Sequence, residues 1–109
     1  MAEKQYTSIK EFYPFYLTEH LNPTCRKLHF AGTTLLFVDL IYALVTQTWW
    51  MLALIPLIGY GFAWVGHFFF EKNKPATFQY PLYSLGSDFI MYADLLTGKQ
   101  KFNPKNESA

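Results

Sequence analysis

The sequence has a long apolar middle section between two polar ends. From Phe30 to Phe70 the only charged residue is Asp39, whereas the ends carry the other sixteen of the seventeen charged residues. The polar triplet TQT at residues 46–48 divides this section into two apolar runs. Each run approaches the ~20 residues that a membrane-spanning helix needs. The pattern therefore predicts two long helices joined by a short turn.

Local signals indicate where these helices begin and end. Asn22-Pro23 is typical of a helix start, with asparagine as the N-cap and proline at the first helical position. We expect the helix that begins there to run to about Val45. Trp49-Trp50 opens the second run, and paired tryptophans fit the aromatic belt of a membrane interface.

The basic residues indicate which side of a membrane each end faces. Arg26 and Lys27 precede the first run, Lys72 and Lys74 follow the second, and the TQTWW connection contains no basic residue. The positive-inside rule then predicts a helical hairpin with both ends in the cytosol. The alternative is a pair of buried helices in a soluble protein. It is disfavoured because so small a core would leave many of the eleven Phe and eight Tyr uncovered.

Shorter helices are expected on both sides of the hairpin. The stretch Ser8–Glu11 matches a capping box and predicts a helix start, with Pro14 as an internal kink or an early break. Residues 81–98 predict a third helix that stops at Gly98. Its apolar residues at helical spacing are Leu82, Leu85, Phe89, Ala93 and Leu96.

This third helix is not expected to cross a bilayer. Asp88 and Asp94 would then lie in hydrocarbon, which is costly. We expect it along the cytosolic face or over the mouth of the hairpin.

These elements together predict an all-α integral membrane protein, a hairpin of two spanning helices flanked by amphipathic N- and C-terminal helices. Residues 1–109 form a single membrane domain, ordered over about 8–99, with a flexible tail at 100–109. The net charge of +1, without a basic stripe, argues against a nucleic-acid partner. Cys25 is the single cysteine, so no internal disulfide framework is expected. No signal peptide is expected, because the first apolar block begins far from Met1.

All three histidines of the sequence are expected on one side of the membrane. His29 and His67 each lie 18 or 19 residues from the turn, or about 27 Å at the α-helical rise, so antiparallel helices bring them to the same depth. His20 precedes the first long helix on that side, and Glu71 follows His67 by one helical turn. Three imidazoles and a carboxylate are a plausible site for a first-row metal. The alternative is that each histidine is simply hydrogen-bonded at the interface.

Two further features concern the hairpin itself. Gly59, Ala63 and Gly66 share one face of the second helix and would let a neighbouring backbone approach closely, either within the chain or in a homo-oligomer. Asp39 lies halfway along the first helix, where a carboxylate is costly and is usually functional or paired. Its plainer explanation is a hydrogen bond to Tyr42, Tyr60 or a threonine.

Two long segments carry a resemblance to a known family. The stretches EFYPFYLTEHLNPTCRKLHFAGT and GYGFAWVGHFFFEKNKPATFQYPLYSLGSDFIMYADLLTGK resemble, over about residues 8–99, the Mpo1-like family of small membrane proteins. Its characterised fungal member is an endoplasmic-reticulum 2-hydroxy fatty acid dioxygenase of phytosphingosine breakdown. The resemblance implies an α-oxidation that depends on Fe²⁺ and O2 and yields the fatty acid one carbon shorter. It also implies that His20, His29 and His67 are the metal ligands of one ion.

The resemblance suggests roles for other residues as well. Glu71, Asn73 and Asp88 fall in recurring motifs of the family, and we assign Glu71 as a fourth ligand or proton acceptor, Asp88 as a second catalytic residue and Asn73 to the substrate. Arg26 or Lys27 would pair with the substrate carboxylate, although both fit the positive-inside rule equally well.

The host membrane would be a bacterial inner membrane or the endoplasmic reticulum, and the partners a bilayer and a long-chain 2-hydroxy fatty acid. The alternatives are a zinc-dependent lipid hydrolase and a non-enzymatic membrane scaffold or lipid-binding hairpin.

Overall fold

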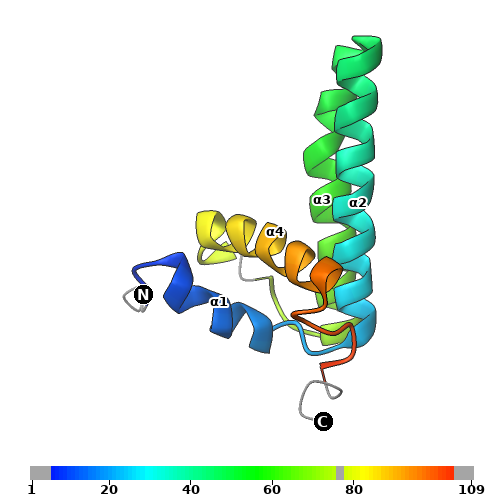
Figure 1. Cartoon of the computed structure of the whole chain (residues 1–109). Helices are drawn as coiled ribbons and strands as arrows, with labels where there is room; N and C mark the ends of the chain where they lie inside the picture. The colour runs from blue at the N-terminus through cyan, green and yellow to red at the C-terminus, as the bar shows by residue number, and fades with distance from the viewer. Residues whose placement is uncertain (1–5, 76–77, 105–109) are drawn as a thin grey trace.

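A computed structural model describes residues 6–75 and 78–104. In these residues all regular secondary structure is helical and no strand occurs, which confirms the all-α class. Figure 1 shows α2 and α3 side by side as a tall pair, with α1 and α4 extending from its lower part. The elements are α1 (Ile9–Thr18), α2 (Pro23–Thr46), the 3₁₀ helix η1 (Trp49–Ala53), α3 (Leu54–Val65), the π-helical turn η2 (Gly66–Glu71) and α4 (Pro81–Thr97).

The first long helix follows its local signals. The side chain of Asn22 accepts hydrogen bonds from the N–H groups of Thr24 and Cys25, and Pro23 occupies the first turn. The helix ends one residue beyond the predicted Val45, and Gln47 closes it in the left-handed conformation (φ 55°). These bounds confirm the prediction for α2.

The second apolar run is continuous but changes its helical type twice. η1 precedes Pro56, which has no N–H to donate to the turn before it, so an α-helix cannot extend normally through that point. At the other end the carbonyl of His67 accepts the N–H of Lys72, five residues on, and that of Asn73 at 3.0 Å. π-helical turns are rare and frequently mark functional sites.

Small residues let α2 approach the second run closely. A Cβ added to Gly66 would lie 2.8 Å from Sγ of Cys25, and one added to Gly32 would lie 2.7 Å from Cβ of Phe62. Gly66, part of the predicted small-residue face, is therefore covered within the chain. A homo-oligomer through Gly59, Ala63 and Gly66 stays a prediction, and Gly66 is not accessible to it.

Helix α1 packs on α4 through an aromatic cluster. Ser8 caps α1 as predicted by accepting the N–H of Glu11. Of the two alternatives for Pro14, a kink or an early break, the break does not occur, because α1 continues through Pro14 to Thr18. The buried residues of this layer are Phe12, Tyr16, Tyr80, Met91 and Leu95.

Helix α4 leaves its apolar stripe exposed and buries another face. Met91 and Leu95 are buried together with Ser84 and Ser87, whereas the predicted stripe is exposed, to 79% at Leu82 and 65% at Leu96. Small residues on α4 allow α1 to come close. The Cβ of an alanine at Gly86 would lie only 2.5 Å from Cδ1 of Ile9 on α1.

Two helical segments, Pro23–Thr46 and Trp49–Glu71, are long and apolar enough to cross a membrane. Only 28% and 17% of their most apolar windows are buried. The core helices of a soluble protein would be mostly buried, so this exposure counts against that alternative. Large apolar side chains that remain exposed include Val38, Ile41, Val45, Leu57 and Phe69.

The beginning of the predicted tail is packed rather than free. Gln100 and the carbonyl of Lys101 accept hydrogen bonds from Arg26, and the ring of Phe102 contacts that of Phe30. Residues 100–102 therefore contact α2, the flexibility of the tail at 100–109 stays a prediction, and residues 105–109 lie outside the described part of the chain.

Candidate metal centre

Three histidines from different elements meet where α2 begins and the second apolar segment ends. His20 lies in the connection between α1 and α2, His29 in the second turn of α2, and His67 in η2. All three are buried, and one ring nitrogen of each lies within 4.8 Å of those of the other two. The predicted convergence is confirmed, and the π-helical turn contributes one of the three rings.

Hydrogen bonds determine which nitrogen of each ring faces the centre. Nδ1 of His20 lies 2.6 Å from the carbonyl oxygen of Tyr16, and Nδ1 of His29 lies 2.9 Å from that of Cys25. A carbonyl oxygen can only accept, so each Nδ1 carries the proton and donates. The lone pair of each neutral imidazole is then on Nε2.

Asn73 accepts the corresponding Nδ1 hydrogen bond of the third histidine, His67. Its Oδ1 lies 2.7 Å from Nδ1 of His67, while its Nδ2 donates to the carbonyl of Glu19 at 3.1 Å. That second bond orients the amide so that its oxygen faces the imidazole. Asn73 therefore positions His67 in the manner typical of residues behind a metal ligand, and its predicted contact with substrate stays a prediction.

The donor set fits a first-row metal ion. Nε2 of His20 and Nε2 of His29 are 3.2 Å apart. Two nitrogens on one ion at about 2.1 Å would be about 3.0 Å apart in octahedral and about 3.4 Å apart in tetrahedral coordination. The three rings are nearly perpendicular to one another, with interplanar angles of 85°, 78° and 87°. Lone pairs directed at each other repel, and a shared cation would remove that repulsion.

Burial favours the form of the ligands that a metal requires. Desolvation, reinforced by the neighbouring His29 and His67, lowers the pKa of His20 well below its ordinary value. The imidazole is therefore neutral at physiological pH and free to coordinate through Nε2.

Behind His20 lies a pair of residues that connects the centre to a cavity. The ring of Tyr16 stacks on His20 with 3.9 Å between centroids, and the Tyr16 hydroxyl donates to Oδ1 of Asp88 on α4. Burial raises the pKa of Asp88 to about 7, although the Tyr16 hydrogen bond opposes this shift. Asp88 is thus poised to gain or lose a proton near neutral pH.

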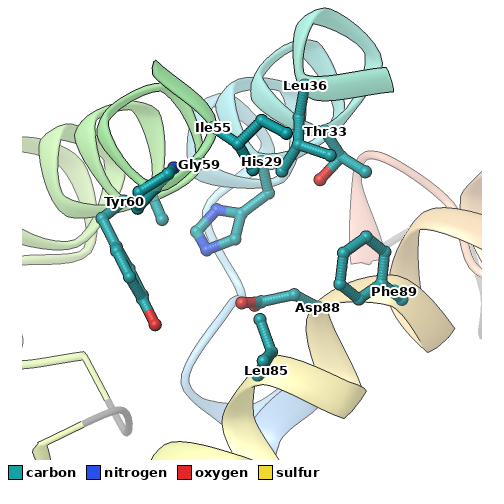
Figure 2. Close-up of a pocket in the computed structure, with 11 residues that line it drawn as sticks. His29, Thr33, Leu36, Ile55, Gly59, Tyr60, Leu85, Asp88 and Phe89 are labelled. Carbon is teal, nitrogen blue, oxygen red and sulfur yellow. The ribbon is translucent and has the colours of Figure 1, made fainter. Parts of the chain in front are cut away.

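A largely apolar, partly open cavity of about 350 Å³ lies beside His29 and is lined by residues of α2, α3 and α4. Figure 2 shows the imidazole of His29 and the carboxylate of Asp88 both directed into it. Its other polar side chains are Thr33 and Tyr60. Its apolar lining includes Leu36, Ile55, Pro56, Leu85 and Phe89.

Glu71 does not join this centre. Its carboxylate accepts the N–H of Asn22 at 2.6 Å, and Glu71 is not among the residues whose ligand atoms meet. The partner that its carboxylate finds is the N–H of Asn22, the residue that caps α2. Its role is to hold the end of η2 to the start of α2.

The two basic residues assigned to the substrate also lie elsewhere. Arg26 is buried, and its guanidinium donates to the carbonyl oxygens of His20 at 2.6 Å and Lys101 at 2.7 Å. Lys27 is exposed, and neither residue lines the cavity. Sequence reasoning missed that Arg26 ties the loop of His20 to the segment after α4, because no local pattern signals a bond between residues so distant in the chain.

Comparison with known proteins identifies one family. Residues 6–100 match the model of a family described as 2-hydroxy-palmitic acid dioxygenase Mpo1-like, and this range contains all three histidines. No curated protein and no solved structure matches the chain. The match covers nearly the whole sequence, and the chain therefore belongs to the Mpo1-like family.

Proposed function

We propose that this protein is a membrane-embedded, iron-dependent dioxygenase that converts a long-chain 2-hydroxy fatty acid to the fatty acid one carbon shorter. The observation that carries this proposal is the set of three buried imidazoles, one ring nitrogen of each within 4.8 Å of those of the other two, beside an apolar cavity. The family name supports the same chemistry.

The reaction balances without an external reductant. A 2-hydroxy acid and O2 give the shortened acid, CO2 and water. The bond between C1 and C2 breaks, the two carbons together lose four electrons, and O2 takes up four. Ferrous iron held by His20, His29 and His67 would supply the redox chemistry with O2.

The chain's own residues would orient the substrate. Its polar head fits the end of the cavity that carries His29, Thr33 and Asp88, and its hydrocarbon fits the apolar lining. We assign Asp88 to accepting the proton of the 2-hydroxyl group, because its pKa is close to neutrality and its carboxylate is held by Tyr16.

We further propose that the two apolar segments span a bilayer with both ends of the chain in the cytosol. The centre would then lie near one membrane surface, and the exposed apolar face of α4 would contact lipid. This arrangement leaves the head of an amphipathic acid at the interface while its tail stays in an apolar environment.

The test uses the full chain purified in detergent, loaded with Fe²⁺ under anaerobic conditions and mixed with 2-hydroxypalmitic acid and O2. We expect about one iron per chain and formation of the acid one carbon shorter with matching O2 uptake. His67→Ala should lose both metal and activity, whereas Lys27→Ala, at an exposed position, should keep both. Full activity in folded His67→Ala would contradict the proposal.

Two controls separate the alternatives. Asp88→Asn should keep its metal and lose about 10²-fold or more in kcat, because only proton transfer is removed. Lipid hydrolysis without O2 by zinc-loaded protein would favour a hydrolase, and failure to bind any metal would favour a scaffold.

A further inference from the structure

The cavity beside His29 extends along α2 and α3. Three close approaches show that α2 and the second apolar segment are antiparallel. Along α2 they follow the order Cys25, Gly32 and Leu36, and their partners on the second segment are Gly66, Phe62 and Gly59. The lining residues of α3 therefore extend from beside His29 toward the turn at residues 46–48, which we call the tip.

The chemical character of the lining changes along this direction. His29 and Thr33 lie on successive turns of α2 at the lower end, and Leu36 lies on the next turn. On α3 the lining extends from Ala63 to Ile55, about 12 Å at the α-helical rise. Toward the tip the walls are Leu36, Ile55 and Pro56, which offer a hydrocarbon chain a continuous apolar path.

Gly59 occupies the middle of this path. It lines the cavity, and a Cβ added there would lie 3.5 Å from Cδ1 of Leu36, an ordinary contact. A larger side chain could therefore start from this position without moving α2, but its outer atoms would fill the cavity. Gly61, two residues on, is exposed and has no atom within 4 Å of an added Cβ, so it provides a matched control on the same helix.

We propose that the acyl chain of the substrate lies in the part of this cavity between α2 and α3, which we call the groove. We propose further that Gly59 and Leu36 set the chain length that the groove accepts. The inference rests on the proposed function for the identity of the substrate. It adds that chain length is discriminated by Gly59 on α3 and Leu36 on α2.

The experiment measures kcat/KM and binding for a series of saturated 2-hydroxy fatty acids of increasing length. Gly59→Leu should shift the preferred length downward by about four carbons, the size of the added side chain, and reduce kcat/KM for long acids at least about 10-fold. Gly61→Leu should keep the wild-type profile. Leu36→Ala should shift the preference toward longer acids. If Gly59→Leu fails to fold, this second variant tests the assignment of the groove by itself.

Binding is read independently as the rise in Tm of metal-free protein with each acid. If wild-type protein turns over no 2-hydroxy acid but its binding profile shifts in the two variants, the proposed function fails and the assignment of the groove stands. If the variants fold and both profiles match wild type, the assignment of the groove is overturned.

Discussion

The hydrogen bonds of Asn73 predict a measurable effect on metal affinity. In Asn73→Ala the Nδ1–H of His67 loses its acceptor at 2.7 Å, and the carbonyl of Glu19 loses its donor at 3.1 Å. The ring of His67 is then free to rotate or to change tautomer, which places a proton on Nε2 where the metal requires a lone pair. Loss of such a partner typically lowers metal affinity by about 10–100-fold, or about 1.4–2.7 kcal/mol.

The assay is an anaerobic titration of metal-free protein with Fe²⁺ against a competing chelator. Asn73→Asp keeps an oxygen acceptor for Nδ1 and should retain most of the affinity, although it loses the donor to Glu19. Lys74→Ala, exposed in the same loop, should bind as wild type. Wild-type affinity in folded Asn73→Ala would refute the reasoning that this amide sets the tautomer of His67.

Three further changes test the packing and electrostatics of the fold. Gly66→Ala should destabilise the protein by about 1–3 kcal/mol because its Cβ would lie 2.8 Å from Sγ of Cys25, whereas Gly61→Ala should be neutral or stabilising; thermal unfolding in detergent compares the two. Burial raises the pKa of Asp88 from 3.8 to about 7, so between these values the folded protein holds a proton that the unfolded chain has released. Its contribution to stability therefore falls as pH rises from about 4 to about 7, and a difference in Tm between wild type and Asp88→Asn that stays constant over this range would contradict it. Arg26→Met should cost at least about 2 kcal/mol through lost charged hydrogen bonds to buried carbonyls, and an unchanged Tm would refute its role as a tie.

Much of the secondary structure could be predicted from the sequence because the interactions that decide it are local. Asn22 caps α2 through N–H groups two and three residues away, and Gly98 ends α4 in the left-handed conformation that glycine adopts without strain. The common depth of His29 and His67 is likewise a matter of counting residues on either side of a turn.

The face that a helix buries and the partner that a polar group finds were decided by the tertiary structure. Leu82 and Leu96 belong to an apolar stripe at helical spacing, but the spacing alone does not say what covers it, and α1 packs on the other side, which carries Ser84 and Ser87. Arg26 and Asn73 have side chains that could bind a carboxylate or a substrate, but their partners are carbonyls and an imidazole from distant segments. The chain by itself determined where helices form and that His29 and His67 come to the same level of the two long helices, because capping and helical rise act over a few residues. Only the folded arrangement decided which side chains hold those histidines in place, because hydrogen bonds between distant segments depend on how the helices pack.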